Sequence, residues 1–78
     1  MTEKEYLEFQ KLISMGEELN FYYKNDEYWI SHNPGRSFLS RTKNSYTQEF
    51  SGYKELFENA TIEGTKISEI YPELRLLK

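Results

Sequence analysis

The side chains that could do chemistry in this chain of 78 residues are few and scattered. His32 is the single histidine, there is no cysteine, and the four glycines are too far apart to form a phosphate-binding loop. A catalytic nucleophile needs a base and a group that orients the base, and the sequence places no such partner beside His32. We therefore expect His32 to be a polar residue at the end of a strand. We predict no catalytic residue and no enzyme activity.

Two pairs of neighbouring acids are the remaining candidates for acid–base chemistry or metal binding. They are Glu17 with Glu18, and Asp26 with Glu27. Adjacent carboxylates in a strand point to opposite faces, which suits chelation poorly. The absence of cysteine excludes Cys-based zinc and iron–sulfur sites. The sequence thus predicts no metal site and no cofactor.

Aromatic side chains are the main resource for binding. The stretch from Glu18 to Ser31 carries five aromatic rings in fourteen residues, and Tyr and Trp are the residues most often found as interface anchors. The candidate partner-binding residues are Tyr22, Trp29, Phe38 and Tyr46. The same rings could instead be buried under a later helical segment, and the sequence leaves these two arrangements open.

Charge is distributed unevenly along the chain. Residues 1–27 carry seven acids and three bases, residues 28–48 carry three bases and no acid, and residues 49–78 carry six acids and four bases. The three bases Arg36, Arg41 and Lys43 make the middle segment the one place suited to an anionic partner.

A nucleic-acid surface is the alternative that these bases raise. Tyr28, Trp29 and Phe38 would stack on the bases of a single strand, while the cationic side chains of the same segment follow the phosphates. A pI of about 5.1 argues against such a surface, because the attraction for a polyanion would be weak.

The elements that must position these residues begin with a helix. Residues 2–5 form a capping-box pattern, and Gly16 can supply a left-handed stop. We predict a helix over about 3–15, packed on the aromatic stretch. Its expected core face, at helical spacing, is Tyr6, Phe9, Leu12 and Ile13.

An antiparallel hairpin should follow, closed by a two-residue turn at Asn25-Asp26. This pairing puts Tyr22 opposite Trp29. The face expected to be core carries Leu19, Phe21, Tyr23, Tyr28 and Ile30. The other face carries Asn20, Tyr22, Lys24, Glu27, Trp29 and Ser31.

Turn signals at 32–35 and 43–45 frame a third strand at about 37–42 and a fourth at 46–50. A Pro-Gly type II turn is not the favoured hairpin closure. Whether Phe38 or Leu39 points inward therefore stays open.

The last third of the chain predicts short elements. Ser51 is a natural cap for a helix to about Asn59. Gly64 separates that helix from a helical turn over 67–71 that Pro72 ends. We expect residues 73–78 to return as an edge strand.

These elements predict a single small α+β domain over residues 1–78. It has an N-terminal helix, an antiparallel meander of three to five strands, one or two short helices and a C-terminal edge strand. No apolar run approaches the roughly 20 residues that span a bilayer, and the first residues are not those of a signal peptide. We expect a cytoplasmic protein without membrane contact.

Three segments carry a resemblance to known proteins. They are LNFYY at 19–23, EYWIS at 27–31, and YKELFENATIEGTKISEIY at 53–71. Together they resemble a family of small, largely uncharacterised α+β proteins from low-GC Gram-positive bacteria and their phages. The resemblance implies a compact, free-standing domain, and it brings no catalytic residues with it.

The preferred function is that of a non-enzymatic binding domain whose aromatic sheet face contacts another protein. Homodimerisation through that face or through the last strand is one version of this prediction, because an uncovered edge invites pairing. In a phage protein, the partner could be a host defence or regulatory protein that the domain blocks. Single-stranded nucleic-acid binding is the alternative function.

Overall fold

The structure, a computed structural model, describes residues 1–76. The last two residues of the predicted edge strand therefore lie outside the described part. The elements follow one another in the order α1 (Glu3–Ser14), β1 (Leu19–Tyr23), β2 (Asp26–Asn33), β3 (Arg36–Arg41), β4 (Tyr46–Phe50), α2 (Tyr53–Asn59), β5 (Thr61–Ile62), β6 (Thr65–Lys66), α3 (Ile67–Ile70), the 3₁₀ turn η1 (Tyr71–Glu73) and β7 (Leu74–Leu76).

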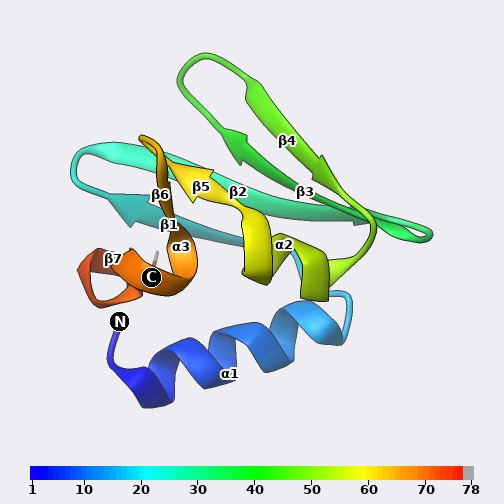
Figure 1. Cartoon of the computed structure of the whole chain (residues 1–78), viewed down its shortest axis with the longest axis horizontal. Helices are drawn as coiled ribbons and strands as arrows, with labels where there is room; N and C mark the ends of the chain where they lie inside the picture. The colour runs from blue at the N-terminus through cyan, green and yellow to red at the C-terminus, as the bar shows by residue number, and fades with distance from the viewer. Residues whose placement is uncertain (77–78) are drawn as a thin grey trace.

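The fold is α+β, as the sequence predicts. β1 to β4 form an antiparallel meander, and β7 returns to pair with β1, giving the order β4-β3-β2-β1-β7. The helices gather on one side of this sheet (Figure 1). Their apolar residues and the inward side chains of the sheet make one core. We call the sheet face toward the helices the inner face and the opposite face the outer face.

α1 begins with the predicted capping box. The Thr2 hydroxyl accepts from the Glu5 N–H at 3.1 Å, and the Glu5 carboxylate accepts from the Thr2 N–H at 2.8 Å. The prediction that Leu12 lies on the core face is wrong, because Leu12 is 42% exposed while Ile13 beside it is 1% exposed. Successive helical residues point about 100° apart, so Leu12 lies on the flank of the core stripe rather than within it.

The hairpin has the predicted faces but a different register. The observed pairs are Leu19 with Ile30, Asn20 with Trp29, Phe21 with Tyr28, Tyr22 with Glu27, and Tyr23 with Asp26. The turn residues are therefore Lys24 and Asn25, and Lys24 takes a positive φ of 55°. Asp26 lies in the strand because its carboxylate binds the Arg41 guanidinium across the β2–β3 pair. A slip of two residues keeps every side chain on its face, so the hydrophobic pattern alone does not detect it.

The Pro34-Gly35 turn does close a two-residue hairpin, with Gly35 at a φ of 74°. Leu39 lies opposite Ile30 and is 1% exposed, so it is the inward residue that the sequence left open. Phe38 lies on the outer face. β3 and β4 fall within one residue of their predicted bounds.

The short elements that follow are partly as predicted. α2 begins at Tyr53 after Gly52, whose φ is 116°, so Ser51 is not its cap. The β5–β6 hairpin was not predicted, because two-residue strands carry no periodicity. α3 occupies the predicted helical turn, and Pro72 lies in the 3₁₀ turn after it. β7 is the expected edge strand.

Aromatic rings fill much of the core between the layers. The Phe9 ring meets the rings of Phe21 and Phe57 edge to face, with centroids 5.7 and 6.0 Å apart. Tyr6 stacks on Tyr71 at 4.3 Å. Such pairs contribute about 0.5–1.5 kcal/mol beyond their area burial, which strengthens a core in a chain with no disulfide.

Candidate functional site

Three aromatic side chains form a diagonal row on the outer face of the sheet. In the strand pairing, Tyr22 lies opposite Glu27 and Phe38 lies opposite Ser31, with Trp29 midway between those two on β2. The row therefore advances one strand and two residues at each step. Diagonal neighbours of this kind have their Cβ atoms roughly 7–8 Å apart, within reach of aromatic rings. We call Tyr22, Trp29 and Phe38 the aromatic stripe.

The stripe is open to solvent at its centre. Trp29 is 40% exposed, whereas Tyr28 and Ile30 on either side of it are 5% and 0% exposed. Tyr22 and Phe38 are half-buried. The helices of residues 1–76 pack on the inner face (Figure 1), whereas the strand registers place these rings on the outer face. Trp29 is thus exposed rather than buried under a helical segment, while Tyr22 and Phe38 are intermediate between the two arrangements that the sequence left open.

Hydrogen-bonded polar side chains flank the stripe. The Asn20 side-chain amide donates to the Glu27 carboxylate at 2.6 Å, on the two strands that carry Tyr22 and Trp29. The hydroxyls of Ser40 and Thr47 are hydrogen-bonded to each other at 2.9 Å on the β3–β4 side. These bonds fix the side chains that frame the rings, so a partner would meet a largely preorganised surface.

The charged side chains of this face contact other groups of the same chain. Arg36 forms an ion pair with Glu49. The Arg75 guanidinium lies 5.6 Å from the centre of the Tyr22 ring and donates to the backbone carbonyl of Lys24. The face therefore offers rings, hydroxyls and amides rather than a field of one sign.

Tyr46 does not join the stripe. It lies opposite Arg41, which lies opposite the buried Tyr28, so it belongs to the inner side of the sheet. Tyr46 is nevertheless 61% exposed. The prediction that places it on the outer face with Trp29 is wrong, because the alternation along β4 puts its side chain on the other side.

The three bases of the middle segment are not brought together. Arg36 is on the outer face and bound to Glu49. Arg41 is on the inner side, where its hydrogen bond to Asp26 raises the pKa of the guanidinium above its usual value. Lys43 is exposed in the turn between β3 and β4. No continuous track for phosphates is formed by these side chains.

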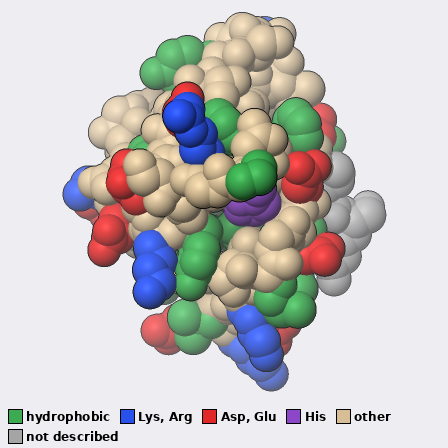
Figure 2. Space-filling view, turned by 90° about the vertical axis from the view of Figure 1, so that its right-hand side faces the viewer, with side chains coloured by type: hydrophobic (Ala, Val, Ile, Leu, Met, Phe, Trp, Pro, Cys, Tyr) green, Lys and Arg blue, Asp and Glu red, His purple; other side chains and the backbone are tan. Residues whose placement is uncertain are grey.

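His32 lies near the end of β2, where the sequence placed it, and both of its ring nitrogens are engaged. Nδ1 is 2.9 Å from the Ser37 hydroxyl, and Nε2 is 3.1 Å from the backbone carbonyl of Glu17. Figure 2 shows the histidine ring in the middle of this end of the molecule. The Ser37–His32 distance suits a nucleophile and its base, but Ser37 is only 2% exposed. The contacts join β2, β3 and the loop before β1.

The His32–Ser37 contact was missed at the sequence level, although a signal for it exists. Once Pro34 and Gly35 are taken as the two turn residues, Asn33 lies opposite Arg36 and His32 opposite Ser37. Directly opposed side chains share a face and can touch. The contact could not be predicted because a Pro-Gly type II turn is not the favoured closure of a two-residue hairpin.

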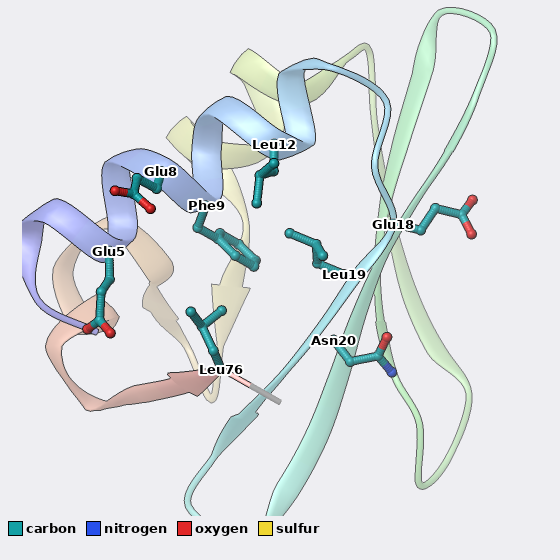
Figure 3. Close-up of a pocket in the computed structure, with 8 residues that line it drawn as sticks. All are labelled: Glu5, Glu8, Phe9, Leu12, Glu18, Leu19, Asn20 and Leu76. Carbon is teal, nitrogen blue, oxygen red and sulfur yellow. The ribbon is translucent and has the colours of Figure 1, made fainter. Parts of the chain in front are cut away.

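The acidic pairs do not gather into a site. Asp26 is held by Arg41, and Glu18 points away from the space between α1 and the sheet (Figure 3). Within residues 1–76, no three His, Asp or Glu side chains lie close enough together to hold a metal ion. None of the helices in that range has the length and apolar character needed to cross a membrane.

A groove of about 410 Å³ lies between α1 and the strands β1 and β7. Figure 3 shows Phe9 and Leu12 on the helix facing Leu19 and Leu76 on the strands, while Asn20 points to the outer face. The wall of the groove ends at Leu76, the last residue described. The groove accounts for the exposure of Leu12, which borders the core without being enclosed by it.

No protein-family model, curated protein or solved structure matches the chain.

Proposed function

We propose that the protein is a non-enzymatic binding domain that contacts another protein through the aromatic stripe. The observation that supports this most strongly is the exposure of Trp29, 40%, on a sheet face that the helices of residues 1–76 leave uncovered. A large ring held at the surface by a rigid sheet loses little conformational entropy on binding, which is why Trp and Tyr dominate interface anchors.

The surroundings of the stripe indicate the chemistry of the partner. This face carries charges of both signs: Arg36 is paired with Glu49, and Arg75 on β7 is balanced by Glu27, both of which lie opposite Tyr22. A partner would therefore gain little from long-range charge attraction. We expect it to offer an apolar patch framed by hydrogen-bonding groups, and we expect the affinity to depend weakly on salt.

Nucleic acid is the less favoured partner on the same grounds. Arg36 and Arg41 lie on opposite faces and are each bound to an acid. Lys43 is in a turn beyond both. Stacking on Trp29 would lack the cationic track that single-strand-binding surfaces provide.

A matched pair of variants tests this function. Trp29→Ala removes the centre of the stripe, and Leu7→Ala removes a side chain that is 59% exposed on α1, away from the sheet. Tagged chains would be incubated with lysate of a low-GC Gram-positive bacterium, the source that the family resemblance suggests. We expect a protein that is retained by the native chain and by Leu7→Ala and is lost with Trp29→Ala. Equal retention by all three chains would contradict the proposal, as would material that nuclease removes.

A further inference from the structure

β4 lies at one edge of the sheet, and no strand of residues 1–76 pairs with the side of β4 that points away from β3. It ends the strand order of the sheet and pairs with β3 alone, and Figure 1 shows no described element beside its free side. Proline and charged side chains, lysine above all, commonly protect an edge from pairing. The sequence YTQEF contains no proline and no lysine, and its one charged residue, Glu49, is paired with Arg36. The strand is therefore competent to accept another strand.

The pairing inside the sheet determines which backbone groups are available. The Thr42 N–H donates to the Glu27 carbonyl at 3.0 Å, so Thr42 directs its backbone groups toward β2. Since the direction alternates along a strand, Arg41 directs its backbone groups toward β4. Tyr46, opposite Arg41, then faces β3, while Thr47 and Glu49 direct their N–H and C=O groups to the open edge.

We propose that this edge pairs with β4 of a second copy of the chain, antiparallel and centred on Gln48. In this register, Thr47 of each copy lies opposite Glu49 of the other. Their outward N–H and C=O groups would form four hydrogen bonds, two on each side of the two-fold axis. No backbone group has to leave its present partner for these bonds to form.

The side chains fit this register as well. Tyr46 would lie opposite Phe50 of the second copy on the inner side, which gives the exposed Tyr46 ring an aromatic partner. Glu49 would lie opposite the neutral Thr47, and its charge is already compensated by Arg36. A register centred on Glu49 would instead set two carboxylates opposite each other. A register centred on Thr47 would leave Phe50 unpaired.

This dimer goes beyond the proposed function, because β4 carries none of the aromatic stripe. A two-fold axis perpendicular to the sheet keeps the outer faces of both copies on the same side. The five-stranded sheet would be doubled, and its outer surface would present two stripes. A partner with two matching patches would then bind with increased avidity.

Two substitutions at one position test the pairing. Thr47→Pro removes the outward N–H, and proline is tolerated in an edge strand where that group faces solvent. Thr47→Ala keeps the N–H and removes the hydroxyl and the γ-methyl group. By sedimentation equilibrium we expect the native chain to approach twice 9.4 kDa at micromolar to millimolar concentration. Thr47→Pro should raise the dissociation constant at least tenfold, and Thr47→Ala should change it less than threefold.

Amide hydrogen exchange of the native chain gives a second readout that needs no variant. On concentrating the protein, the amides of Thr47 and Glu49 should become protected at least tenfold, while the amide of Gln48, already directed to β3, should not change. A mass of 9.4 kDa throughout would overturn the proposal. So would a dimer that the folded Thr47→Pro chain retains, or a dimer without protection at Thr47 and Glu49.

Discussion

Tyr28 and Trp29 are neighbours in β2 with opposite surroundings. Tyr28 is 5% exposed, and burial raises the pKa of its hydroxyl, partly opposed by Arg41. Trp29 is 40% exposed. Because side chains alternate between the two faces of a strand, Tyr28 contributes to the core, whereas Trp29 is available for contact with a partner.

Stability measurements should separate these two roles. Trp29→Ala should lower the free energy of unfolding by no more than about 1 kcal/mol, because it opens no cavity in the core. Phe21→Ala, at a residue that is 0% exposed, should lower it by about 3–5 kcal/mol. Urea unfolding followed by circular dichroism measures both. A similar large loss for Trp29→Ala would show that Trp29 belongs to the core.

Tyr6 predicts the response of the fold to alkaline pH. Burial, with a contribution from Tyr71, raises the pKa of Tyr6 from 10.0 to about 12. The folded state therefore holds this proton more tightly than the unfolded state. The resulting stability is complete below pH 10 and is lost as the pH rises toward 12.

The matching experiment replaces Tyr6 with Phe. The Tyr6 hydroxyl has no hydrogen-bond partner among residues 1–76, so Tyr6→Phe should keep the stability at pH 7 or raise it by up to about 1 kcal/mol. Thermal unfolding between pH 7 and 12 should show a smaller alkaline loss for this variant. An unchanged alkaline loss would mean that Tyr6 does not control it.

At the level of elements, much of the fold could be predicted because its signals are local. The capping box at Thr2, the helical spacing in α1 and the alternation in β1 and β2 each depend on residues close in sequence. The hairpin register could not be predicted in this way, because it is set by contacts between distant residues. Asp26 binds Arg41, and Lys24 in the turn binds Glu63.

The candidate site was predictable to a similar extent. Alternation correctly placed Tyr22 and Trp29 on the outer face, but the orientation of β3 and β4 depended on the turn at Pro34-Gly35. The register that follows from this turn places Phe38 on the outer face with the stripe and Tyr46 on the inner face. The pairing of Arg36 with Glu49 and of Arg41 with Asp26 was likewise absent from the pattern.

Gln48 links β4 to β5, a strand of the separate two-stranded sheet β5-β6. Its side chain donates to the Thr61 carbonyl at 2.7 Å and accepts from the Thr61 N–H at 3.1 Å, so it acts as a strand partner for β5. Gln48→Ala should lower the free energy of unfolding by about 1–3 kcal/mol, because two backbone groups lose their partner. Thr47→Ala, at an exposed neighbour, should cost about 0.5 kcal/mol or less. Chemical unfolding distinguishes the two, and equal losses would contradict this role.

On the scale of the whole molecule, the fold is asymmetric about its sheet. The helices and the β7 return build a core on the inner face, while the outer face keeps its rings in contact with solvent. A small chain can keep such a face open because aromatic contacts concentrate its core on one side. The same asymmetry leaves one broad surface for a partner.

The proposed function requires direct contact between the partner and the aromatic stripe. The measurement is photo-crosslinking with benzoylphenylalanine in place of Phe38, which lies in the stripe beside Trp29, and in place of Leu7 on α1 as the control. After irradiation in lysate, the Phe38 chain should give one crosslinked protein that excess unlabelled native chain prevents and excess Trp29→Ala chain does not. Crosslinks from position 7 alone, or crosslinks that the Trp29→Ala chain prevents equally well, would contradict binding through the stripe.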